Sequence, residues 1–146
     1  MNKLILSSVR ILFLGYLSYV AVTNLQHIEK SSKFLSKQYK TFEGTLKSRF
    51  NVKLPDCLAH KNIDKHKTLI VQLSSYGVIV MSLLAIFACS CFTAAVGINY
   101  FIMAMITSNY LSFDYKNFNQ YKDMAISLGV LGLSVMLSCN TTSSCC

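Results

Sequence analysis

The chain has 146 residues, of which 53% are apolar and only 14% are charged, and its formal net charge is +8 at pH 7. An ordinary soluble domain carries about 25% charged residues. No residue from Thr68 to Phe113 is charged, and about 20 helical residues cross a bilayer core about 30 Å thick. This uncharged run therefore holds two crossings, and the composition excludes an ordinary water-soluble domain.

The first apolar segment, "LILSSVRILFLGYLSYVAVTNL", covers about residues 4–25 and predicts a membrane helix. A signal peptide would have a shorter apolar region and a small-residue cleavage site. Neither feature appears, so we expect the segment to remain as a helix. Arg10 is the one ionisable residue well inside it. Such a residue marks a functional site or pairs with a partner, unless its long side chain reaches the interface, and both readings stay open.

Residues 30–50 predict an amphipathic helix. Apolar side chains recur at steps of three and four and share one face, and five lysines share the nearly opposite face. This pattern is typical of a helix in the lipid headgroup layer, although packing on a neighbouring subunit is an alternative. Nucleic acid is disfavoured because the aromatic rings lie on the wrong face to stack beside the lysines. The apolar set is Leu35, Tyr39, Phe42, Leu46 and Phe50, and the predicted anionic-lipid site is Lys30, Lys33, Lys37, Lys40 and Lys47.

Three further spans are expected at about residues 68–87, 93–111 and 121–139. The predicted fold is all-α: a single membrane domain, 1–146, that forms an integral membrane four-helix bundle with an amphipathic interfacial helix between the first and second spans. Gly129 and Gly132 in the last span would permit close helix approach.

The positive charge gathers in two loops. The segment from Gln26 to Lys67 holds ten Lys and Arg residues, and Lys116 and Lys122 follow the third span. The positive-inside rule directs such loops to the cytosol or the mitochondrial matrix. Four crossings then place both termini on the other side, which is the intermembrane space for a protein of the mitochondrial inner membrane.

The sequence contains no recognisable catalytic motif, so we expect no catalytic residue, no cofactor and no metal site. His60 and His66 are six residues apart, with Asp56 and Asp64 nearby, but this spacing matches no helical pair of metal ligands. We interpret both histidines as solvated loop residues. Asn99 and several Ser and Thr residues lie within the spans, where hydrogen bonds between helices explain them.

The order of these features resembles that of the DoxX-like family of small four-helix membrane proteins. Arg10 in "VRILFLGYLSYVAVTNL" stands where that family has an early Arg. Leu54-Pro55 in "FNVKLPDCLAH" stands where the family often has Leu-Pro before its second helix. The family's Gly and Lys near the end of the first helix are replaced here by "VAVTN". Members of the wider family are linked to quinone-coupled oxidation, so the resemblance implies the handling of a quinone or another small molecule.

Two functions therefore compete. In the first, the chain is a non-catalytic structural accessory subunit of a larger membrane complex, for which the mitochondrial respiratory chain is favoured. Its partners would be other membrane subunits and an anionic lipid such as cardiolipin, and it would bind no nucleic acid. It would not itself be an enzyme, even as a subunit of an oxidoreductase complex. The alternative is a DoxX-like quinone- or small-molecule-handling membrane protein. Sparse polar groups inside the spans favour the first.

Overall fold

The computed structural model describes residues 3–87, 91–108 and 118–139, and all regular structure in them is helical. The all-α prediction is thus confirmed. The helices α1, α3 and α5 are long and apolar enough to cross a membrane, and α4 is apolar but has 17 residues. In chain order the elements are α1 (Lys3–Gln26), α2 (Ile28–Phe50), the 3-10 helix η1 (Asp56–Leu58), α3 (His60–Phe87), α4 (Cys91–Thr107) and α5 (Phe118–Cys139).

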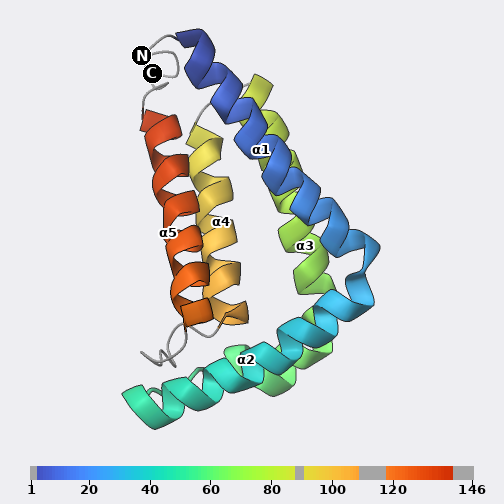
Figure 1. Ribbon diagram of the computed structural model, residues 1–146. Helices are drawn as coiled ribbons and strands as arrows, with labels where there is room; N and C mark the ends of the chain where they lie inside the picture. Colours follow the sequence, from blue (N-terminus) through green and yellow to red (C-terminus); the bar gives the residue numbers. More distant parts are fainter. Residues whose placement is uncertain (1–2, 88–90, 109–117, 140–146) are drawn as a thin grey trace.

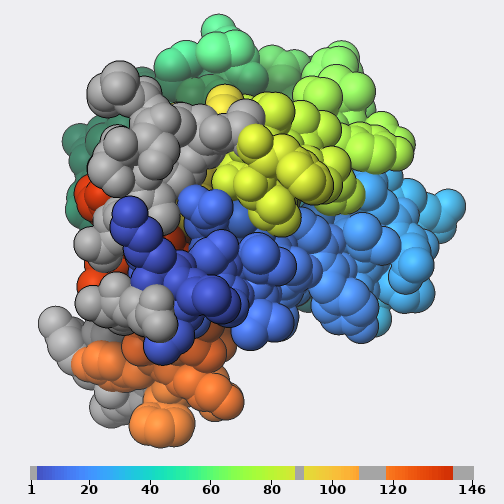
Figure 2. Space-filling view, turned by 90° about the horizontal axis from the view of Figure 1, so that it is seen from above, coloured from blue at the N-terminus to red at the C-terminus, as the bar shows by residue number. Residues whose placement is uncertain are grey.

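The four apolar helices pack in sequence, and α2 lies across one end of them. The helix α1 packs on α3, α3 on α4, and α4 on α5, while α2 contacts α3 and α4 (Figure 1). Seen from above, α1 lies alongside the end of α3 (Figure 2). The start of α1 and the end of α5 lie at one end of the molecule, and α2 lies at the other (Figure 1).

The chain bends sharply between α1 and α2 without losing its backbone hydrogen bonds. His27 leaves the helical region at φ −112° and ψ 41°. Its N–H still donates to the Thr23 carbonyl at 3.1 Å, and the Ser31 N–H donates to the His27 carbonyl at 2.9 Å. Both of these N–H groups therefore have a hydrogen-bond partner. The bend turns α2 away from α1 and leaves neither of them unsatisfied.

The helix α2 continues unbroken through Gly44 and ends at Phe50. Asn51 follows in the left-handed region at φ 51°, and its N–H donates to the Leu46 carbonyl. Asn tolerates this conformation better than most residues do, and it is a common way to end a helix. After η1, α3 begins at His60, earlier than the span predicted from residue 68, because its charged first turns extend the helix beyond the apolar segment.

The described residues expose many large apolar side chains and bury small hydroxyl residues beside the apolar core, unlike those of a water-soluble bundle. Small hydroxyl residues are fully enclosed, such as Thr93 and Ser134 at 0% exposure, whereas Leu12 and Phe87 are 74% and 82% exposed. Helices in lipid associate through small residues and keep large apolar side chains outside. The buried polar residues among those described are Ser32, Ser36, Ser75, Ser82, Thr93, Ser127, Ser134 and Ser138.

Gly97 lets α4 and α5 approach closely. A Cβ atom at this position would lie 1.8 Å from the Ser134 Oγ and 2.4 Å from the Ser134 Cβ. At Gly129 and Gly132, in contrast, an added Cβ would have no such neighbour within 4 Å, and both residues are exposed. The expectation that these two glycines permit the close approach is therefore wrong, and Gly97 has that role.

Candidate functional site

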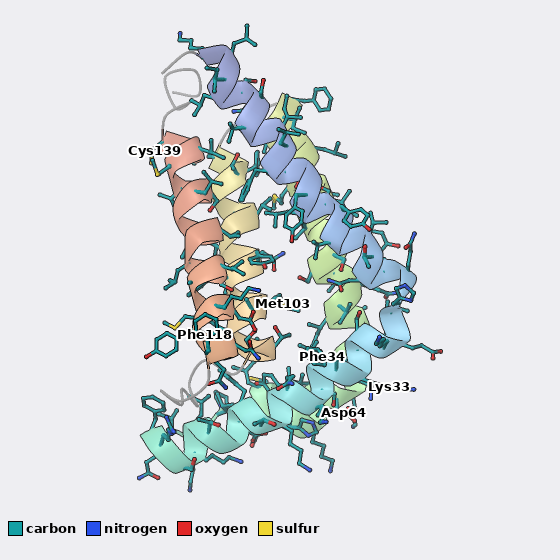
Figure 3. The ribbon with its side chains drawn as sticks, viewed as in Figure 1. Lys33, Phe34, Asp64, Met103, Phe118 and Cys139 are labelled. Atoms are coloured by element: carbon teal, nitrogen blue, oxygen red, sulfur yellow. The ribbon has the colours of Figure 1, made fainter. Side chains whose placement is uncertain are left out.

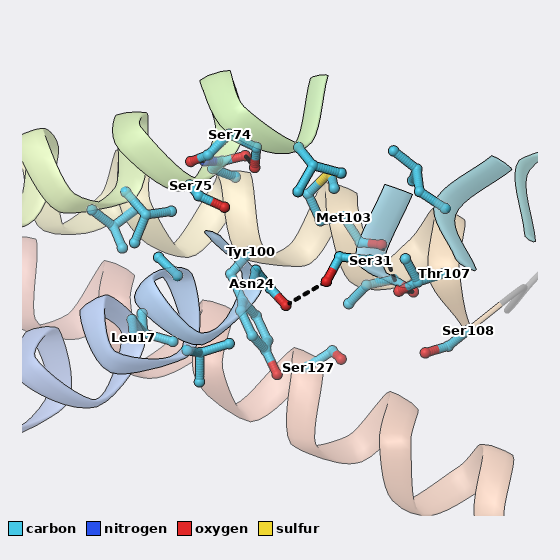
Figure 4. A pocket seen from close by; sticks show the side chains of 18 of the residues that line it. Leu17, Asn24, Ser31, Ser74, Ser75, Tyr100, Met103, Thr107, Ser108 and Ser127 are labelled. Carbon is cyan, nitrogen blue, oxygen red and sulfur yellow. Dashed lines mark hydrogen bonds between the residues drawn. The ribbon is translucent and has the colours of Figure 1, made fainter. Parts of the chain in front are cut away.

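A pocket of about 530 Å³ lies inside the helix group above α2, within the usual size range of small-molecule sites. All five α-helices contribute to its lining (Figure 4). On the side of the pocket away from α2, the helices α1, α3 and α4 are held together by a hydrophobic cluster of Leu14, Leu17, Ala85 and Val96. Leu17 and Val96 belong both to this cluster and to the pocket wall, so the packed core closes one end of the pocket.

The other end of the pocket is polar. Asn24 and Ser31 lie on the two sides of the α1–α2 bend, and the Ser31 hydroxyl donates a hydrogen bond of 3.5 Å to Asn24 Oδ1 (Figure 4). Thr107 and Ser108 at the end of α4 and Asp123 in the first turns of α5 also line this region. The pocket therefore grades from polar near α2 to apolar near the core.

Hydrogen bonds between α3 and α4 cross the pocket wall. The Ser74 hydroxyl is 3.2 Å from Asn99 Oδ1, and Asn99 Nδ2 donates to the Ser74 carbonyl at 3.3 Å. This confirms the expectation that an interhelical hydrogen bond explains Asn99. Ser75 beside it lines the pocket and is only 4% exposed, and its hydroxyl has no hydrogen-bond partner within the described ranges.

A second polar cluster attaches α2 to the start of α3. Glu43 accepts the His60 backbone N–H at 3.0 Å, and it forms an ion pair with Lys47 at 2.8 Å. The first N–H groups of a helix have no partner within it, and a carboxylate there also interacts favourably with the helix dipole. Glu43 thus caps α3 from a neighbouring helix. The Tyr39 hydroxyl adds a bond of 2.5 Å to the Leu58 carbonyl.

Ser36, His60 and Asp64 meet in the same cluster, but they are not arranged as a catalytic triad. His60 Nε2 lies 3.1 Å from the Ser36 carbonyl oxygen and 3.3 Å from Ser36 Oγ. A carbonyl can only accept, so we assign the proton to Nε2. The Ser36 hydroxyl donates to Asp64 Oδ1 at 2.5 Å. A triad needs a histidine nitrogen that accepts the serine proton and a carboxylate that holds the other nitrogen. Here the cluster joins two helices.

The two carboxyl groups of this cluster are shifted toward their ionised forms. The hydrogen bond from Ser36, together with that from Lys67, lowers the pKa of the Asp64 carboxyl. The hydrogen bond from Lys47 lowers the pKa of Glu43, and the His60 N–H adds to this effect. Burial raises the pKa of the Tyr39 hydroxyl, with a smaller effect of Glu43, so Tyr39 remains a donor. All of these groups lie at the α2 end, outside the apolar segments.

The five lysines of the predicted lipid site all lie on the exposed face of α2. Lys47 is also paired with Glu43 of the same helix. The opposite face differs from expectation: Leu35 and Tyr39 are buried, and α2 contacts α3 and α4 of its own chain. Only at its far end is the apolar stripe open, where Phe50 is 55% exposed.

Arg10 lies two turns into α1, at the end of the molecule opposite α2. Its Nε is buried and has no hydrogen-bond partner in the described part of the chain. The described acidic residues cannot supply one, because they lie in α2, η1, or the first turns of α3 and α5 (Figure 1). They are Glu29, Glu43, Asp56, Asp64 and Asp123.

Sequence reasoning missed the pocket and the α2–α3 cluster. His60, expected to be a solvated loop residue, is half-buried at the start of α3. No group of His, Cys, Asp and Glu in the described residues could hold a metal ion. A signal for the enclosed polar face does exist in the sequence: Ser75 and Ser82 are seven residues apart, as are Ser127 and Ser134, so each pair lies on one helix face.

No protein-family model, curated protein or solved structure matches the chain significantly. The resemblance to the DoxX-like family therefore stays a prediction.

Proposed function

We propose that this chain is an integral membrane protein that serves as a non-catalytic structural subunit of a larger membrane complex. In this proposal α1, α3, α4 and α5 cross the bilayer, and α2 lies at one of its surfaces. The exposed surface supports the membrane assignment, because many large apolar side chains face outward while small Ser and Thr residues pack between the helices.

Arg10 is the observation that carries the role as a subunit. A charged residue inside a membrane helix is costly unless it is paired. Among the described residues the buried Nε of Arg10 has no hydrogen-bond partner, and the carboxylates lie at the far end of the molecule. A carboxylate on a helix of a partner subunit would supply the missing charge. We therefore propose other membrane subunits as the partners of this chain.

Recovery of the chain with its partners tests this role. Removing one member of a buried charge pair costs about 3–5 kcal/mol, enough to detach a small subunit. We expect Arg10→Leu to lower co-purification in mild detergent, while any complex that still assembles keeps normal turnover on native gels. Lys61→Gln, which removes an exposed charge at the other end, should assemble normally. Full assembly of Arg10→Leu with lost turnover would contradict the structural role.

The membrane we propose is the mitochondrial inner membrane, and the complex is one of the respiratory chain. The exposed lysine face of α2 supports an anionic lipid such as cardiolipin as a second partner. The excess of Lys and Arg in the loop segments supports a matrix-side position for α2, with the termini in the intermembrane space. Cardiolipin should remain with the purified protein, and Lys33→Gln combined with Lys37→Gln should release it.

A second candidate function is the handling of a quinone or another lipid-soluble small molecule. The pocket favours it, because polar groups that are sparse along the sequence converge on one partly open volume of about 530 Å³. The same Arg10→Leu experiment separates the two functions, since a ligand-handling protein would assemble normally and lose activity.

A further inference from the structure

The Ser75 hydroxyl marks a point in the pocket at which a bound molecule would gain a hydrogen bond. Ser75 is 4% exposed, lines the pocket, and has no partner for its hydroxyl among the described residues. Its Oγ is not among the fully enclosed unpaired atoms of the described residues, so it is open to the pocket and to a bound molecule. Asn99, on the facing helix α4, uses one amide hydrogen toward the Ser74 carbonyl, so its amide has a further donor. Two helices thus present hydrogen-bonding groups to the same volume.

The charges around the pocket determine what kind of molecule fits. Among the described residues no Lys, Arg or His lines the pocket, and Asp123 is the one carboxylate in that lining. An anionic head group would find no cation among these residues. Hydroxyl, amide and phenol groups dominate the polar lining instead, and these suit an uncharged group that both donates and accepts hydrogen bonds.

The arrangement of the helices gives the molecule a route from the bilayer. The helix α1 is fastened to α3 and α5 is fastened to α4, while no extensive contact joins α1 to α5 in the described ranges. The pocket has lining residues on both α1 and α5, including Tyr16 and Ile126. Tyr16 is 60% exposed, so the outer wall of the pocket reaches the lipid-facing surface.

We propose that the pocket binds an uncharged, single-tailed lipid whose head carries a hydroxyl group. The head lies between Ser75 and the polar residues near α2, and the tail extends toward Leu17 and Val96, where the lining is apolar. This inference deepens the second candidate function and rests on it. It does not depend on the role of Arg10.

Photo-crosslinking of the purified full-length chain in nanodiscs tests the inference. The probe is a monoacylglycerol with a diazirine in its tail. Its competitors are a monoacylglycerol, a fatty acid and an alkylamine of the same chain length. We expect saturable crosslinking to pocket residues that only the unlabelled monoacylglycerol displaces efficiently. Ser75→Ala should weaken binding about tenfold through the loss of one hydrogen bond.

Two further variants make the test specific. Ser8→Ala removes an exposed hydroxyl that bonds the Leu4 carbonyl within α1, far from the pocket, and should bind as the wild type does. Ala21→Phe should fill the pocket and abolish crosslinking. If the Ala21→Phe variant does not fold, the smaller substitution Ser75→Ala still tests the inference.

Three outcomes would overturn the inference. They are non-saturable crosslinking, equal binding by Ser75→Ala and the wild type, and stronger displacement by the alkylamine, which would assign the site to a cation at Asp123. Each leaves the membrane topology and the assembly role untouched, because thiol accessibility and co-purification measure those separately. Failure of the lipid proposal is therefore distinguishable from failure of the proposed subunit role, and stronger displacement by the alkylamine would still leave the ligand-handling function in place.

Discussion

Gly97 shows how one residue sets the distance between two helices. Its missing side chain admits the Ser134 hydroxyl, and a Cβ there would lie 1.8 Å from the Ser134 Oγ. The Cβ is rooted in the backbone, so Gly97→Ala would push α4 and α5 apart. We expect a loss of about 1–3 kcal/mol in the free energy of unfolding, as for other overpacked sites. Denaturation in mixed micelles, followed by circular dichroism, measures it.

Gly132 provides the matched control for this variant. An added Cβ there has no neighbour within 4 Å, and Ala is the better helix former by about 1 kcal/mol. Gly132→Ala should therefore be neutral or stabilising. Combining Gly97→Ala with Ser134→Gly should restore much of the lost stability, because the swap makes the same space on the other helix. Equal stability of the Gly97→Ala and Gly132→Ala variants would show that α4 and α5 do not meet as described.

At the scale of elements, the junction of α2 and α3 should depend on pH. The pKa values of Asp64 and Glu43 are lowered in the fold by hydrogen bonds and ion pairs. Their stabilising effect is therefore fully present above the unfolded carboxyl pKa of about 4. It is lost as the pH falls through the lower folded values. We expect α2 to loosen from α3 in acid, below about pH 4.

An environment-sensitive label on Cys57 would report this change. Cys57 is exposed in η1, next to Leu58, whose carbonyl accepts the Tyr39 hydroxyl. The signal of the label should change as the pH is lowered into the acid range. Asp64→Asn should reduce the size of this change, because the variant has no carboxylate at position 64 to protonate. Glu29→Gln, an exposed carboxylate elsewhere on α2, should leave the titration unchanged. Identical titrations of Asp64→Asn and the wild type would argue against the junction.

The helical elements were predictable from the sequence, because hydrophobic runs and steps of three and four define them without tertiary information. The predicted segments about 4–25 and 30–50 match α1 and α2 closely. What covers the face of α2 was not predictable, since periodicity identifies an apolar stripe but not its neighbour. Leu35 and Tyr39 are buried against their own chain rather than left for a bilayer or a partner.

The pocket could not be derived for a related reason. Its polar lining comes from five helices, and Ser75 and Asn99 appear in the sequence as isolated polar residues. Only the packing order of the helices brings them to one volume. The spacing of Ser127 and Ser134 indicates an enclosed small-residue face, but it does not indicate which helix that face meets.

At the scale of the whole molecule, the two ends should lie on opposite sides of a membrane. Cys57 and Cys139 are both exposed, and Cys139 lies at the end of α5 away from Lys33 and Asp64 (Figure 3). In chains that retain one of these cysteines, an impermeant maleimide should label Cys57 from one side of sealed vesicles and Cys139 from the other. Labelling of both from the same side would refute the four-crossing proposal.

The apolar helices differ in length. At 1.5 Å per residue, the 28 residues of α3 extend about 42 Å and the 17 of α4 about 25 Å. A hydrocarbon layer is about 30 Å thick, so the charged first turns of α3 extend beyond it, whereas the described part of α4 falls short of it by about 5 Å. In the proposed topology a bilayer that thins locally would match α4. Such hydrophobic mismatch draws a protein toward thinner membranes and toward neighbours that share the thinned region.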